Sequence, residues 1–275
     1  MASPLPQTIV DELEAIASPV EENMSHFLDE ANPVVVQLLD AAERLAKADA
    51  FQASQWKGRI YALTGNRERV DYWFKNARAL GRDWTQEYNH SSTLINMGYF
   101  SDAARLTGQY LDISTNKLTE NVALAIGLFD LAGAMTAYEV LDRAQLHSEP
   151  ILRSFAECAW SVLQTMNVRQ EDVQGVLDIA GELLRENNLW WQGQAPRLFA
   201  FSSEEDSGIL YELRIATSPQ FAAELTEAFV ERAIARDAYQ PGFSFGFIGV
   251  GESSFVAGRQ AAPVAAASPG LRRIR

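Results

Sequence analysis

The stretches Leu63–Leu80, "LTGNRERVDYWFKNARAL", and Ile95–Leu111, "INMGYFSDAARLTGQYL", share one pattern that decides the fold. In each stretch a glycine marks a turn, and a second helix with an apolar face follows it. Gly65 and Gly98 lie thirty-three residues apart, and Ala132–Gly133 marks a third turn about thirty-four residues after Gly98. Regular spacing of this kind predicts an internal repeat whose unit is a pair of antiparallel helices.

The helix after each turn repeats the positions of its core residues. Small and medium-sized residues recur there at similar offsets, which places them on one helix face. The three sets are Val70, Phe74 and Ala77, then Ala103, Thr107 and Tyr110, and then Ala137, Leu141 and Ala144. One helix pair cannot bury such a face alone, so neighbouring pairs are expected to stack into a continuous core.

This pattern resembles the tetratricopeptide repeat family, whose unit is a helix pair of about 34 residues. The resemblance covers about residues 51–150, and the first unit matches it best, through Gly58, Tyr61, Phe74 and Ala77. It implies a mainly α fold, a tetratricopeptide-like helical hairpin array or α-solenoid. It also implies that the first helices of the pairs line a concave surface that binds a protein or peptide.

Changes of pattern divide the chain into four segments. Residues 1–50 are predicted to form an N-terminal helical cap, with a short second helix over Glu21–Pro33. Residues 51–190 are predicted to hold the tetratricopeptide-like helical repeats, of which the last is degenerate. Residues 251–275 are rich in Ala, Gly, Ser and Pro, and we expect a flexible tail there.

Between the repeats and the tail, residues 191–250 are predicted to form a small α+β module. Arg197–Ser202 and Ile209–Ala216 are rich in aromatic and branched residues, and the polar turn between them favours a hairpin. Ser218–Pro219 is a helix start signal, and "FSFGFIGV" (243–250) is typical of a third strand. The sequence therefore predicts a C-terminal ββαβ module whose sheet buries one face.

Composition excludes several classes of function. The formal net charge of −13 argues against binding to phosphate backbones, so nucleic acid is not expected as a partner. No run approaches the roughly 18 uninterrupted apolar residues of a membrane span, and the N-terminal stretch does not have the pattern of a signal peptide. Cys158 is the only cysteine, so no disulfide forms within the chain. We therefore expect a cytoplasmic protein that does not bind membranes.

The residue types that carry chemistry do not gather into a recognisable motif. His26, His90 and His147 have no neighbour at metal-ligand spacing, and Cys158 lies in an apolar helical stretch where a buried thiol is inert. "GFIGVG" (246–251) follows a strand, but no helix and no Lys-Ser/Thr pair follow it, as a phosphate-binding loop requires. We expect no catalytic residue, no metal and no cofactor.

The predicted partner-binding face consists of the inward residues of the first helices. It is polar at its N-terminal end and apolar at the other, which suits an amphipathic helix or an extended peptide. Its residues are Gln55, Arg59, Tyr88, Ser92, Ile95, Val122, Ile126 and Phe129. The predicted function is therefore a non-catalytic adaptor or regulatory scaffold for a protein or peptide. The sequence fixes neither the identity of the partner nor the oligomeric state.

Two alternative functions remain open from the sequence. The first is an enzyme or small-ligand sensor with its site between the helical array and the ββαβ module, near Trp190, Trp191 and Tyr211, because pockets occur at domain interfaces. The second is a structural subunit of a larger assembly, which would expose a large apolar patch. A pocket with converging polar groups favours the first alternative, whereas an open apolar groove along residues 88–129 favours the scaffold.

Overall fold

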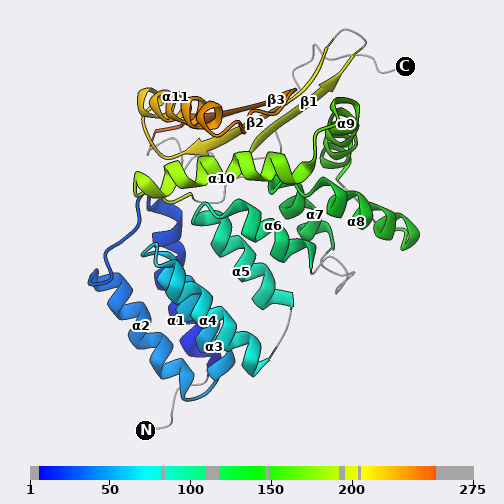
Figure 1. The fold of residues 1–275 in the computed structure, drawn as a ribbon. Coiled ribbons are helices and arrows are strands. Elements are labelled where there is room, and N and C mark those ends of the chain that lie inside the picture. Colours follow the sequence, from blue (N-terminus) through cyan, green and yellow to red (C-terminus); the bar gives the residue numbers. More distant parts are fainter. Residues whose placement is uncertain are drawn as a thin grey trace.

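The structure is a computed structural model, and it describes residues 6–81, 84–109, 118–146, 149–191, 196–203 and 206–251. Within these ranges the protein is mainly helical, with eleven helices and a three-stranded sheet close to the C-terminal end (Figure 1). The predicted flexible tail falls almost entirely on residues 252–275, which lie outside the described residues.

The helices and strands occur in the following order along the chain. They are α1 (Pro6–Asn23), α2 (Pro33–Ala46), α3 (Ala50–Ala62), α4 (Arg67–Leu80), α5 (Trp84–Asn96), α6 (Phe100–Gly108), α7 (Leu118–Gly127), α8 (Leu131–Arg143), α9 (Pro150–Met166), α10 (Gln170–Glu186), β1 (Arg197–Ser202), β2 (Ser207–Ile215), α11 (Pro219–Ala235) and β3 (Phe243–Gly249). Asp49, Asn66 and Asp130 each accept a hydrogen bond from a backbone N–H of the helix that follows. These side chains satisfy amide donors that the first helical turn leaves unpaired.

Helices α3 and α4, α5 and α6, and α7 and α8 pack against each other as consecutive pairs. Gly65 and Gly98 have φ angles of 70° and 74° at the first two turns, a conformation that glycine adopts without steric cost. The third turn lies at Leu128–Asp130, slightly before the predicted Ala132–Gly133, which belongs to the first turn of α8. The repeat spacing therefore located three helix pairs.

The predicted short helix over Glu21–Pro33 is wrong. Helix α1 continues through Pro19 to Asn23, and the chain then forms a loop up to α2. In this loop the Phe27 N–H donates to the Asn188 carbonyl at 3.1 Å, and the Ser25 carbonyl accepts from the Trp190 N–H at 2.9 Å. Hydrogen bonds to a segment more than 160 residues away replace those that a local helix would have made.

Helix α10 does not continue the pattern of the preceding pairs. It packs on α6 and α11, and Figure 1 shows it crossing between the helical array and the C-terminal sheet. Gly181 of α10 meets Gly98 of the α5–α6 turn so closely that a Cβ on Gly181 would overlap the Gly98 carbonyl. The guanidinium of Arg185, one helical turn further on, donates to the same carbonyl. Two glycines at one crossing point therefore set the position of α10.

Two adjacent tryptophans join the two apolar cores of the molecule. One core is built from α1–α4, and the other runs from α5 to β3. Trp190 belongs to the first core and lies edge-on to Phe27, whereas Trp191 belongs to the second and contacts Phe100. The indole N–H of Trp191 donates to the Arg214 carbonyl of β2 at 3.2 Å. The segment after α10 therefore connects both cores and the sheet.

The C-terminal sheet has the order β1-β2-β3, in which β1 and β2 are antiparallel and β2 and β3 are parallel. Helix α11 connects β2 to β3, so the predicted ββαβ order is present. The inner face of the sheet packs on the array, where Tyr211 is completely buried and its hydroxyl donates to the Gly127 carbonyl at 2.5 Å. The sheet thus covers the end of α7.

The crossing of α10 over Gly98 predicts a difference between two glycines of the same helix. We expect Gly181→Ala to lower the free energy of unfolding by about 2–3 kcal/mol, because the new methyl group overlaps backbone atoms that cannot rotate away. Gly175→Ala is the matched control, since a Cβ there meets nothing within 4 Å. Its effect should be a gain of up to about 1 kcal/mol from helix propensity.

Urea denaturation of both variants measures these changes. Equal effects of the two substitutions would show that the crossing is not tightly packed.

Candidate binding channel between α11 and β3

Helix α11 is amphipathic, and its two ends are defined by local chemistry. The Ser218 hydroxyl accepts from the Phe221 N–H at 3.1 Å, and Pro219 occupies the first turn, where its missing N–H is not needed. Ala222, Leu225, Phe229 and Ala233 recur at helical spacing and are buried against the sheet and α10. The helix begins where the Ser218–Pro219 signal had predicted it.

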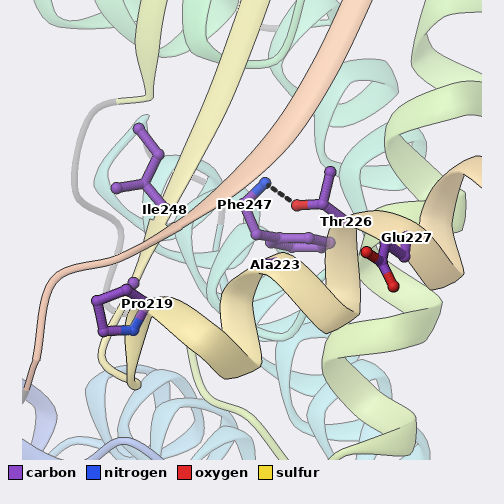
Figure 2. A pocket seen from close by; sticks show the side chains of 7 residues that line it. Pro219, Ala223, Thr226, Glu227, Phe247 and Ile248 are labelled. Carbon is purple, nitrogen blue, oxygen red and sulfur yellow. Dashed lines mark hydrogen bonds between the residues drawn. The ribbon is translucent and has the colours of Figure 1, made fainter.

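A hollow lies on another side of α11, where the helix runs beside β3. It has a volume of about 460 Å³ and is lined by Pro219, Ala223, Thr226 and Glu227 of α11 and by Phe247, Ile248 and Gly249 of β3 (Figure 2). The hollow is open to solvent and mostly apolar. We call this hollow, together with the exposed side chains of Val230 and Ile234 further along α11, the α11–β3 channel.

The apolar side chains of the channel continue beyond the hollow. Ala223, Val230 and Ile234 lie in one row along α11, at intervals of seven and four residues, and Glu227 lies between the first two. Val230 is 46% exposed and Ile234 is 67% exposed, although both are large and apolar. From Ala223 to Ile234 the row extends for about 16 Å at 1.5 Å per residue. That length equals about five residues of extended chain.

The opposite wall of the channel is the free edge of β3. The Gly242 carbonyl accepts from the Ile209 N–H, and the Val250 N–H donates to the Ile215 carbonyl. The backbone N–H and C=O groups of the even-numbered residues of this strand therefore point towards β2. Alternation in a parallel ladder then directs the backbone groups of the odd-numbered residues, such as Phe245, to the other edge. No strand in the described part of the chain pairs with that edge.

Thr226 closes one position of this edge. Its hydroxyl accepts from the Phe247 N–H at 3.0 Å, as Figure 2 shows, and donates to the Ala222 carbonyl at 2.9 Å. A Thr side chain on the covering helix thus protects the strand edge at its C-terminal half. Further towards the start of β3, the Phe243 N–H donates to the Gln240 carbonyl at 3.1 Å. Of the odd-numbered residues 243–247, Phe245 is therefore the one whose N–H makes no hydrogen bond to a described residue.

Charges on α11 are segregated between its two sides. Arg232 forms an ion pair with Glu186 of α10 at 2.7 Å, and Arg236 forms one with Glu182 at 2.7 Å. These pairs hold the pKa of both glutamates below its ordinary value. The outward glutamates of α11 make no ion pair within the described residues: Glu224, Glu227 and Glu231. The channel therefore has a row of unneutralised carboxylates along its outer rim.

The structure places most of the predicted partner-binding residues inside the molecule. Four of them are buried in the second core, with exposed fractions between 0% and 6%: Ile95, Val122, Ile126 and Phe129. Phe129 contacts the rings of Tyr211 and Phe243, because the C-terminal sheet lies over this end of the array. These side chains are part of the packed interior and do not line an open groove.

The polar end of the predicted face is also largely engaged. Arg59 pairs with Glu14 at 3.0 Å and Glu21 at 3.1 Å, so α1 covers this side of α3. Gln55 is 8% exposed and accepts a hydrogen bond from Asn89. Tyr88 and Ser92 are half-buried. The array thus brings Gln55 near α5, but it does not bring the eight residues together on one accessible face.

The alternative site between the array and the module is filled by side chains. Trp190, Trp191 and Tyr211 are 4%, 3% and 0% exposed. Burial raises the pKa of the Tyr211 hydroxyl, which therefore stays protonated and keeps its hydrogen bond to Gly127. Trp191 and Tyr211 act as packing and hydrogen-bonding groups at this interface, whereas the buried indole N–H of Trp190 has no hydrogen-bond partner among the described residues.

Among the remaining candidates for chemistry, Cys158 is half-buried on α9, and burial raises the pKa of its thiol, so the reactive thiolate is disfavoured. His26 is exposed, and His147 lies outside the described residues. No group of three or more His, Cys, Asp or Glu side chains in the described ranges has the geometry to hold a metal ion.

His90 is buried in a network of charged groups between α4 and α5. Its ring stacks on Phe74 with centroids 4.3 Å apart, and its Nε2 lies 3.5 Å from an Asp71 oxygen. Arg78 lies 3.5 Å from Nδ1 and binds Glu87 at 2.8 Å. Burial lowers the pKa of His90, the nearby Asp71 opposes this shift, and Arg78 adds to it. The neutral imidazole is the form that fits this network.

None of the helices in the described ranges is both long enough and apolar enough to cross a lipid bilayer. No protein-family model matches the sequence, and no curated protein or solved structure is significantly similar to the chain. The candidate site therefore depends on the geometry of this structure.

The sequence had located the elements of the channel but not the channel itself. The one signal in the sequence was the position of Val230 and Ile234. These two large apolar residues do not belong to the buried face of α11, so burial in the core does not account for them. The sequence could not predict which edge of β3 stays unpaired, because the strand order and the direction of the backbone groups depend on tertiary contacts.

The pKa of His90 predicts a pH-dependent stability. Because the folded-state pKa lies below the unfolded value of about 6.5, the unfolded chain binds a proton first as pH falls. Stability should therefore decline from about pH 7 towards pH 5, before Asp71 titrates. His90→Phe keeps the stacking on Phe74 and removes the titrating group, so its stability should change less over this range.

Urea midpoints at several pH values compare the two proteins. An equally steep decline in the variant would place the pH dependence at other groups.

Proposed function

We propose that the protein is a non-catalytic scaffold that binds a protein or peptide, and that an extended segment of the partner lies in the α11–β3 channel. The observation that carries this proposal is the edge of β3, which pairs with no described strand and leaves the Phe245 N–H open, together with the exposed apolar residues Val230 and Ile234 on α11. An edge strand and a neighbouring helix form a binding surface for extended peptides, because the strand supplies backbone hydrogen bonds and the helix supplies side-chain contacts.

The helical array supports this site in two ways. Helix α10 lies between the array and α11 and binds Arg232 and Arg236, so the helical wall of the channel has a fixed position. We further propose that α3–α8 are tetratricopeptide-like pairs, on the basis of their repeat spacing and consecutive packing. In this arrangement the repeats are a rigid support, and the ββαβ module carries the binding surface.

A capture experiment with matched variants tests the proposal. Ala223 is exposed and lines the hollow, so Ala223→Trp should fill the channel without disturbing the core. Ala235→Trp adds the same side chain to an exposed position of α11 outside the hollow. We expect a protein from the source lysate to be retained by wild type and by Ala235→Trp, and to be lost with Ala223→Trp.

A third variant, Ser92→Arg, alters the half-buried face of α5 that the sequence had favoured. Loss of the captured protein with Ser92→Arg but not with Ala223→Trp would contradict the channel as the binding site. Circular dichroism and urea midpoints establish that all three variants remain folded.

A further inference from the structure

We infer that the α11–β3 channel selects a basic segment, with Arg or Lys at alternate positions of an extended chain. The inference rests on the proposed function, because it specifies the chemistry of the partner that the channel takes. It follows from the charges of α11, from their spacing and from the apolar row beside them.

Only negative charges of α11 are available to a partner at the channel. Arg232 and Arg236 are neutralised by α10, whereas Glu227 and Glu231 are exposed and make no ion pair with the described residues. The chain as a whole carries a formal charge of −13. A basic segment therefore gains both a long-range attraction and local ion pairs, whereas an acidic segment meets repulsion at the rim.

The spacing of these carboxylates matches an extended chain. Glu227 and Glu231 are four residues apart on a helix, which separates them by about 6 Å along its axis. Side chains at alternate positions of a strand lie about 7 Å apart. Two basic residues separated by one residue can therefore reach Glu227 and Glu231 at the same time.

The apolar row on α11 can contact the methylene groups of a Lys or Arg side chain. Val230 and Ile234 lie beside the glutamates on the side of β3, and both are exposed. Long basic side chains cover apolar surface with their methylene groups while the charged end stays at the rim. The intervening residues of the segment would then point to the outer side of the sheet, where Ile248 is half-buried.

Labelled peptides test this selectivity with the full-length protein. The probe is a fluorescein-labelled nonapeptide of alternating Arg and Val, compared by fluorescence anisotropy at low salt with an alternating Glu–Val peptide. A third peptide has the composition of the probe but carries its Arg residues in one block. We expect the alternating Arg–Val peptide to bind roughly tenfold more tightly than the block peptide, because only alternation aligns its charges with two carboxylates.

A charge reversal on the protein provides the second arm. Glu227→Lys combined with Glu231→Lys should weaken the Arg–Val peptide roughly tenfold or more and should allow the Glu–Val peptide to bind. Two single variants with the same change of charge form a control pair. One is Glu139→Lys at an exposed position of α8, and the other is Glu227→Lys in the channel. The first should have little effect, and the second should weaken binding.

Several results would overturn the inference. Equal binding of the alternating and block peptides, or equal effects of Glu139→Lys and Glu227→Lys, would indicate general attraction to an acidic protein. If Ala223→Trp abolishes binding of Arg–Val and Glu–Val peptides alike and their affinities are equal, the channel stands and its preference for basic segments is wrong. If Ala223→Trp leaves the affinity of the Arg–Val peptide unchanged, both this inference and the proposed site fail.

Discussion

The close approach of Gly98 and Gly181 is the contact on which the rest of the structure depends. It allows α10 to lie directly on the turn between α5 and α6, where any side chain would hold the two backbones apart. From that position α10 binds the arginines of α11 and directs the chain towards the two tryptophans. The location of the sheet, and thus of the channel, follows from this one crossing.

The sequence specified local structure well because local signals determine it. Repeated core positions located the helix pairs, and β1 was predicted with its observed bounds from aromatic and branched residues beside a polar turn. The loop after α1 was mispredicted, because its hydrogen bonds are made with Asn188 and Trp190, far along the chain. Local propensity cannot anticipate a partner that only the tertiary fold supplies.

The predicted binding face failed to appear as an open surface for a similar reason. Ile126 and Phe129 have the apolar character of a groove, but the same character allows them to pack under the C-terminal sheet. An apolar row signals burial or binding, and the position of the neighbouring elements decides between the two. On α11 the apolar residues Val230 and Ile234 lie outside the contact with the sheet and remain exposed.

The adjacent tryptophans have a consequence for how the chain tolerates change in length. Consecutive residues of an extended segment point in opposite directions, and this parity sends Trp190 to one core and Trp191 to the other. Insertion of a single residue before this pair would exchange their directions, whereas insertion of two would restore them. We therefore expect related chains to differ by even numbers of residues between α10 and Trp190.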